Sequence, residues 1–169
     1  PARDLSLDFS SPHLVKNYVS VIRKGEGTPP ANLEDLRGKH IVIQQGDVIY
    51  ELLLKNGLGD QVVFAETQLD VLKAVSEGKA DCALAVRLSS LYLIKNNDLK
   101  NLSLGSQSFL SAQYCYAVRD GQQALMAEIS EGLAVLKDSG EYQRIYDKWL
   151  GLYDESGHHY EDVLFYLAI

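Results

Sequence analysis

The feature that most constrains the fold is an alternation of short apolar runs with segments of helical periodicity in the middle of the chain. The apolar runs, which suit buried strands, are residues 40–44, 61–65 and 82–86. The helical segments are residues 48–56, 69–75 and 88–95, and glycines at 57 and 78 end the first two. Strands that alternate with helices are typical of βαβ units, so the sequence predicts an α/β fold with a mainly parallel sheet.

Further elements are predicted on both sides of this region. They are strands at residues 17–22, 99–104 and 114–118 and a short helix at residues 33–36. Beyond residue 123 the pattern is helical, with one helix expected over 124–137 and another over 142–150, separated by Gly140. The sequence contains no internal repeat and no low-complexity segment.

Charge and cysteine usage exclude some classes of function. The 169 residues include 16 Lys and Arg against 23 Asp and Glu, a net charge of −7, and no basic run occurs. Binding to nucleic acid requires a basic patch, so we exclude a nucleic-acid partner. Cys82 and Cys115 lie far apart in apolar runs without metal-ligand spacing. We interpret both as buried thiols, with a structural disulfide as the alternative.

Five short motifs, taken in order, resemble the amino-acid-binding branch of the type II periplasmic solute-binding family. They are residues 7–12, 32–39, 45–46, 77–83 and 140–151. This resemblance covers about residues 1–151 and implies a periplasmic-binding-protein-like type II clamshell. Within that fold, it implies a nearly complete lobe 2 and the C-terminal part of lobe 1.

The resemblance also implies domain boundaries. Residues 1–18 would be the tail of lobe 1 leading to the hinge, and residues 19–116 would be lobe 2. Residues 117–151 would be helices that return to lobe 1. Residues 152–169 would be a juxtamembrane linker and the start of a candidate transmembrane helix. Most of lobe 1 is absent, so we expect an exposed apolar face where it is missing.

One candidate ligand contact lies near the start of the chain. Arg3 is six residues before Phe9, where similar amino-acid binders place the arginine that clamps the ligand carboxylate. A guanidinium suits this role because it forms two parallel charge-assisted hydrogen bonds. The alternative is a solvated arginine near a chain end.

A second group of candidates opens the first helix of lobe 2: Gln45, Gly46, Asp47 and Val48. The family usually carries a hydroxyl residue here, which helps backbone amides to hold the carboxylate, and Asp47 departs from that pattern. One interpretation of Asp47 is a helix N-cap, a position that favours aspartate. The other is contact with a cationic or hydroxyl group of the ligand.

Val86 and Arg87 form the third candidate group. Amino-acid binders of this family carry an aspartate, which pairs with the ligand α-ammonium, at the position of Val86. An apolar group cannot compensate a desolvated ammonium. The expected ligand is therefore a carboxylate but not a standard α-amino acid. Arg87 is either a second cation for an anionic ligand or a surface residue at a helix end.

The expected mechanism is hinge closure on the ligand by population shift. The predicted hinge strands lie near residues 18–22 and 114–118, flanked by Tyr18, Tyr114 and Tyr116, which are core residues or ligand contacts. We predict no cofactor and no metal, because His158 and His159 lie in a polar linker without other ligand residues nearby.

Three functions compete. The first is the periplasmic sensor domain of a membrane-bound two-component histidine kinase, anchored in the inner membrane by a following transmembrane helix. It is favoured by a polar link, residues 152–157, that leads into the apolar run 163–169. The second is the substrate-binding protein of an uptake transporter. The third is an enzyme on the same fold, such as a dehydratase, although no catalytic constellation is recognisable, so we predict that this domain is not an enzyme. A homodimer is left open.

Overall fold

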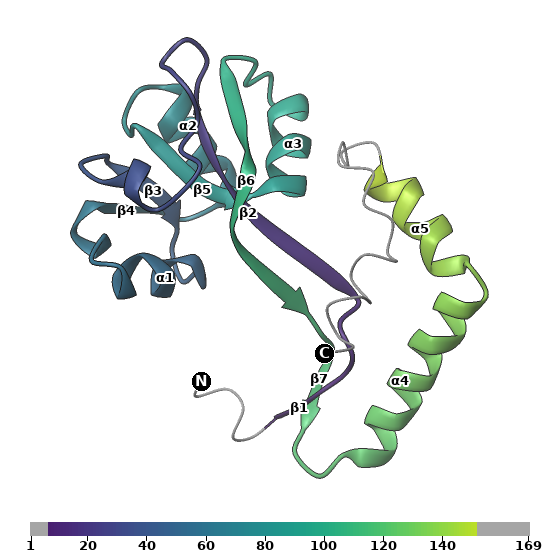
Figure 1. Ribbon diagram of the computed structural model, residues 1–169. Coiled ribbons are helices and arrows are strands. Elements are labelled where there is room, and N and C mark those ends of the chain that lie inside the picture. The colour runs from purple at the N-terminus through teal and green to yellow at the C-terminus, as the bar shows by residue number, and fades with distance from the viewer. Residues whose placement is uncertain (1–6, 152–169) are drawn as a thin grey trace. The chain divides into compact units, whose positions relative to one another are not determined.

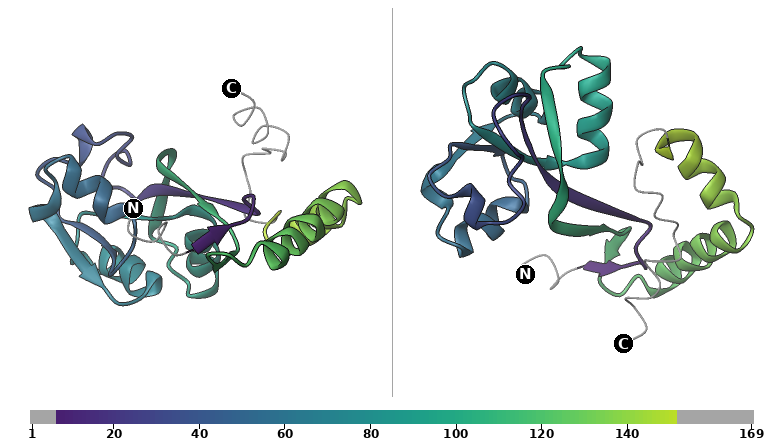
Figure 2. Two further views of the ribbon diagram at one scale, coloured as in Figure 1. Left: turned by 90° about the horizontal axis from the view of Figure 1, so that it is seen from below. Right: turned by 45° about the horizontal axis from the view of Figure 1, so that its top comes forward.

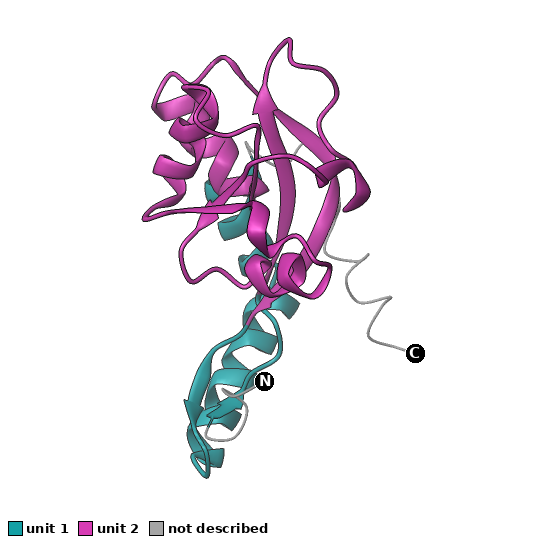
Figure 3. Ribbon diagram, turned by 90° about the vertical axis from the view of Figure 1, so that its left-hand side faces the viewer, with its two compact units in different colours: residues 1–13, 115–169 teal, residues 14–114 magenta. Residues whose placement is uncertain are grey.

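The computed structural model describes residues 7–151. These residues form two compact units (Figure 3). Residues 14–114 form the larger unit, and residues 7–13 together with 115–151 form the smaller one. The chain therefore passes between the units twice, after His13 and after Tyr114. Each unit has its own sheet and helices (Figure 1).

The larger unit is built on a five-stranded sheet with the order β4-β3-β5-β2-β6. Its strands are β2 (Leu14–Arg23), β3 (Ile41–Gln44), β4 (Val62–Ala65), β5 (Cys82–Val86) and β6 (Leu102–Tyr114). The strands β4, β3 and β5 run parallel to one another, whereas β2 is antiparallel to both of its neighbours, β5 and β6. The predicted parallel βαβ core is present, and it is extended by an antiparallel pair.

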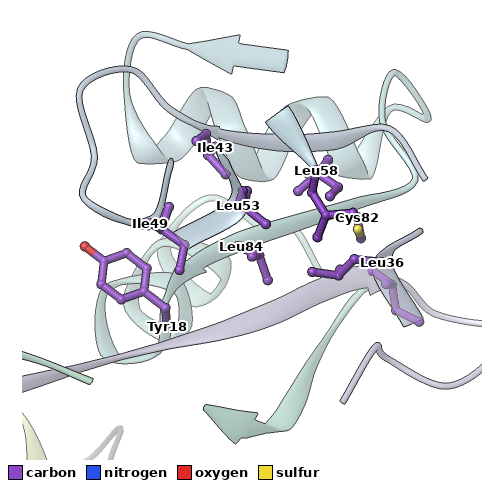
Figure 4. Close-up of a cluster of buried hydrophobic side chains, with 10 residues drawn as sticks. Tyr18, Leu36, Ile43, Ile49, Leu53, Leu58, Cys82 and Leu84 are labelled. Atoms are coloured by element: carbon purple, nitrogen blue, oxygen red, sulfur yellow. The ribbon is translucent and has the colours of Figure 1, made fainter. Parts of the chain in front are cut away.

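Helices cover both faces of this sheet, which explains why its central strands are almost continuously apolar. The helices are α1 (Ile49–Lys55), α2 (Gln68–Ser76) and α3 (Arg87–Asn96), with short 3-10 turns η1 (Glu34–Leu36) and η2 (Gly59–Gln61). One core cluster lies on the α1 face and includes Tyr18, Ile43 and Leu53 (Figure 4). The other lies under α2 and includes Val42 and Leu72. The predicted α/β fold class is confirmed.

One part of the strand prediction was wrong. The sequence suggested separate strands at residues 99–104 and 114–118, but β6 is one strand of 13 residues, followed by β7 (Ala117–Arg119). The region between the predicted strands is rich in small polar residues, which weakens the apolar pattern that marks a buried strand. Because β6 is an edge strand, pairing with β2 is sufficient to form it without burying alternate side chains.

The smaller unit contains the short antiparallel pair β1 (Leu7–Phe9) and β7, with α4 (Gln123–Asp138) and α5 (Glu141–Trp149). The two helices meet at a corner where Gly140 has a φ of +75°, a left-handed conformation that favours glycine (Figure 2). Lys137 donates a hydrogen bond of 3.1 Å to the Pro12 carbonyl, and the Tyr142 hydroxyl donates one to the His13 carbonyl. The corner is thus attached to the segment that leads into β2.

Large apolar side chains of the smaller unit are exposed. Val135 on α4 is 60% exposed, and Ile145 and Trp149 on α5 are 42% and 65% exposed. Among the described residues, α4 packs on β1 and α5 packs on α4, and both helices keep exposed apolar side chains. Within residues 7–151, no helix combines the length and the apolar character needed to cross a membrane. The candidate transmembrane segment at 163–169 lies outside the described residues.

Candidate ligand-binding site

The carboxyl ends of the three parallel strands bring most of the predicted site residues to one edge of the larger unit. Residues 45–48 follow β3, residues 66–68 follow β4, and residues 86–89 include the end of β5 and the start of α3. We call these three segments the strand-end edge. In open α/β sheets, ligands bind outside the carboxyl ends of the strands, so this edge is the candidate site.

The first segment is a tight turn between β3 and α1. Gly46 has a φ of +75°, and the Asp47 amide donates a hydrogen bond of 3.2 Å to the Gln44 carbonyl. The Gln45 amide binds the Ala65 carbonyl at 2.8 Å, which ties the turn to the end of β4. The side chains of Gln45 and Val48 are exposed. The turn has a left-handed backbone conformation at position 46, and this conformation favours glycine.

The Asp47 side chain is directed to β2 more than to the helix that follows it. Its Oδ1 atom accepts a hydrogen bond of 2.5 Å from the Tyr18 hydroxyl, while the Ile49 amide is 3.5 Å away. The N-cap position of α1 is Val48, and no side chain caps that end of the helix. Asp47 therefore fixes the turn against the central sheet through Tyr18, a contact that the sequence analysis did not anticipate.

Tyr18 is a core residue with a polar end at the site. Its side chain is fully buried, and Figure 4 shows the hydroxyl oxygen pointing away from the apolar cluster. Burial of the phenol raises the pKa of Tyr18 above its ordinary value, and the hydrogen bond and negative charge of Asp47 raise that pKa further. The phenol consequently stays protonated and continues to donate to Asp47.

The third segment starts at Val86, which lies directly opposite Tyr18 in the ladder between β5 and β2. Its carbonyl accepts a hydrogen bond of 3.1 Å from the Gln68 carboxamide, which also donates to the buried Ser90 hydroxyl. The Ser89 hydroxyl donates to Gln68 Oε1 at 2.8 Å. Gln68 was not predicted as a site residue, although its place at the start of a helix after a parallel strand was a usable signal.

Arg87 is partly buried at the start of α3, and its side chain reaches β6, which lies beyond β2 in the sheet order. Its Nη1 atom donates a hydrogen bond of 3.2 Å to the carbonyl of Gly105 on β6. The guanidinium is thus held against backbone within the larger unit.

Some predicted residues fall elsewhere. Arg3, His158 and His159 lie outside the described residues. Tyr116 stacks on His13 in the smaller unit, with ring centroids 4.6 Å apart. Tyr114 lies at the far end of β6, where Lys16 Nζ is 4.0 Å from the centre of its ring. Of the three candidate aromatic residues, Tyr18 is the one that the structure connects to the strand-end edge.

The two cysteines differ in their surroundings. Cys82 is fully buried at the start of β5, and burial raises the pKa of its thiol to about 12. Cys115 is only partly buried, so the prediction of a buried thiol is correct for Cys82 and wrong for Cys115. Both are free thiols. In the part of the chain that the structure describes, no three His, Cys, Asp or Glu side chains gather as metal ligands would.

Comparison with known proteins identifies the family. The family named bacterial extracellular solute-binding proteins, family 3, matches residues 1–152. The chain belongs to this family. Its type II periplasmic-binding-protein fold, expected from the sequence motifs, is confirmed by solved structures of that fold.

Individual relatives include both sensors and transport proteins. A crystallised histidine kinase sensor domain with similarity to periplasmic binding proteins is 35% identical, with a TM-score of 0.82 over 89% of this chain and 66% of that one. The L-cystine-binding protein TcyJ of Escherichia coli K12 is 25% identical over 88% of this chain and 56% of its own. The virulence sensor protein BvgS of Bordetella bronchiseptica is 24% identical over 89% of this chain and 12% of its own. The chain thus spans a little over half the length of the cystine-binding relative.

Proposed function

We propose that this chain is the ligand-binding sensor domain of a membrane-bound two-component histidine kinase. In this proposal it lies in the periplasm and is tethered to the inner membrane. The observation that carries the proposal is the sequence identity of this chain to the histidine kinase sensor domain, which is 35%. Its identity to the cystine-binding protein is 25%. The sensor protein BvgS supports the same assignment. The kinase reaction itself belongs to other domains, and this domain binds and signals.

The proposed ligand is an organic carboxylate that is not a standard α-amino acid. It contacts Arg3 and the strand-end edge, at Gln45, Gly46, Asp47, Val48, Val86 and Arg87. The apolar side chain of Val86 supports the exclusion of an α-ammonium at that position, because a desolvated cation needs a charged or strongly polar partner.

Signalling in this proposal is a shift of population between open and closed states. A ligand that binds the closed state more tightly favours that state in proportion to the difference in affinity. The hinge strands of this proposal are those predicted near residues 18–22 and 114–118. The backbone passes between the two units close to them, after His13 and after Tyr114. The attachment of the α4–α5 corner to Pro12 and His13 supports a route from the hinge to the chain beyond Gly151.

The test is a thermal-shift screen of the full-length protein against carboxylates, amino acids, sugars and polyamines. We expect an organic carboxylate to raise the melting temperature, and Arg3→Ala to abolish the shift. Arg37→Ala is the matched control, because Arg37 is an exposed arginine paired with Glu34 at 2.7 Å. No shift with any compound would contradict a ligand-binding function.

A second measurement separates the sensor from a transport protein. Membranes that contain the full-length protein are incubated with labelled ATP, with and without the compound found in the screen. We expect the protein to become phosphorylated, and the compound to change the rate. Ligand binding without any phosphorylation would favour the alternative, a substrate-binding protein of an uptake transporter, which the likeness to TcyJ supports.

A further inference from the structure

The charges of the strand-end edge are unevenly distributed. Asp47 is a partly buried carboxylate, and within residues 7–151 no Lys, Arg or His nitrogen lies within 4.0 Å of it. The partners of its Oδ1 atom are the neutral Tyr18 hydroxyl and the Ile49 amide. A carboxylate that loses water on ligand binding needs a positive partner, because neutral donors replace only part of its hydration.

The cations of this region have other contacts. Arg87 donates to the Gly105 carbonyl on β6. Lys16 Nζ lies 4.0 Å from the centre of the Tyr114 ring and 5.9 Å from that of Tyr18. Neither forms an ion pair with Asp47 in the described structure. Within residues 14–114, Asp47 therefore has no ion pair with a cationic side chain.

Several groups at or next to the edge are uncharged. Gln68, Ser89 and Ser90 bond to one another and to the Val86 carbonyl, and Val86 itself is apolar. Tyr18 meanwhile fixes Asp47 through a short hydrogen bond from a fully buried ring, so this carboxylate is held in one orientation. A preorganised acceptor of this kind favours a directional, charged donor on the ligand.

We propose that Asp47, oriented by Tyr18, binds a cationic group of the ligand. The ligand is then an organic carboxylate that also carries an amine or guanidine, at a position other than the α-carbon. This inference rests on the proposed function, in which the strand-end edge binds the ligand. Tyr18 acts as a positioning residue, because its hydroxyl contacts Asp47 and its ring is buried.

The test compares pairs of compounds that differ in charge but little in shape. The pairs are 4-guanidinobutyrate with 4-ureidobutyrate, and 5-aminopentanoate with hexanoate. Affinities for the full-length protein are measured by titration calorimetry. We expect the cationic member of at least one pair to bind about 10- to 100-fold more tightly, the change that corresponds to one charge-assisted hydrogen bond.

Variants then test whether the preference for the cationic member of a pair depends on Asp47. Asp47→Asn keeps the shape and an acceptor, and should remove the preference while leaving affinity for the neutral member within about threefold. Asp60→Asn is the matched control: Asp60 is an exposed aspartate in η2, outside the strand-end edge, and should leave the preference intact. Tyr18→Phe keeps the charge of Asp47 but frees its orientation, and should reduce the preference without abolishing it.

The outcomes separate this inference from the proposed function. If carboxylates bind but no pair shows a preference for the cation, Asp47 is not the cation site and the ligand-binding function stands. Equal losses for both members of a pair in Asp47→Asn would show that the residue only supports the turn. If no compound in the screen or in the pairs binds, both the proposed function and this inference are wrong.

Discussion

Replacing Gly105 with alanine should destabilise the larger unit. Gly105 lies in β6 where an added Cβ would come within 3.0 Å of the Ser20 hydroxyl oxygen and 3.3 Å of the Pro29 Cβ. Ser20 is fully buried, and its hydroxyl donates a hydrogen bond of 2.7 Å to the Pro30 carbonyl. The new methyl group has no free space, so either the Ser20 hydroxyl turns away or the β6 backbone moves.

Both responses have similar costs. Turning the hydroxyl away leaves a buried donor and acceptor unpaired, which costs about 1–3 kcal/mol. Moving the strand to relieve overpacking costs about 1–3 kcal/mol. Alanine in place of glycine also lowers the entropy of the unfolded chain, which returns about 0.4–1 kcal/mol. We therefore expect the free energy of unfolding to fall by about 1–2 kcal/mol.

The assay is equilibrium urea unfolding followed by far-UV circular dichroism. Gly132→Ala is the control, because Gly132 lies within α4 with no atom near its added Cβ, and it should gain about 0.5–1 kcal/mol. The double variant Ser20→Ala with Gly105→Ala should lose less than the sum of the single losses, since the clashing hydroxyl is gone. Unchanged stability of Gly105→Ala, or simple additivity, would show that the contact with Ser20 is not the cause.

Two further predictions concern stability and reactivity. Arg23 donates to the carbonyls of Val75 and Ala80 and pairs with Glu26, so Arg23→Met should cost about 1–3 kcal/mol in urea unfolding. Glu26→Gln, at a half-exposed partner, should cost under about 1 kcal/mol, and equal losses would contradict the role of the carbonyls. Cys82 keeps its proton in the folded state up to a pKa of about 12, whereas an unfolded thiol ionises near 9. Stability should therefore fall as pH rises above 9, and this fall should be smaller in Cys82→Ala; equal falls in both proteins would exclude the thiol as its source.

Sequence patterns predicted the elements that have a regular apolar pattern. The strand 82–86 was placed at its observed bounds, because a strand covered on both faces is apolar at every position. The helix α4 was located to within one residue at each end, from apolar residues at helical spacing. The strand β6 was not recognised as continuous, because its central residues are polar and it forms by pairing along the edge of the sheet.

The candidate site was predictable only in part, because its side-chain contacts join residues that are distant in the sequence. The turn at Gln45 and Gly46 was found because it resembles a motif of the family. The hydrogen bond between Tyr18 and Asp47 joins residues 29 positions apart, and no local pattern indicates it. Gln68 likewise acquires its role from α3, whose first turn lies beside it in space. Sequence spacing locates the segments of such a site, but the pairing of side chains depends on which strands are neighbours.

The irregular pairing of β6 explains how an edge strand can contribute to the site. Between the pairs Val19 with Ser108 and Val21 with Leu104, three residues of β6 lie opposite the single residue Ser20. Such a bulge turns backbone groups out of the ladder and makes them available to other partners. The Gly105 carbonyl lies in this bulge and accepts from Arg87, the first residue of α3. Because only a glycine leaves room for Ser20 there, the packing that fixes the bulge also fixes the acceptor that holds Arg87 at the strand-end edge.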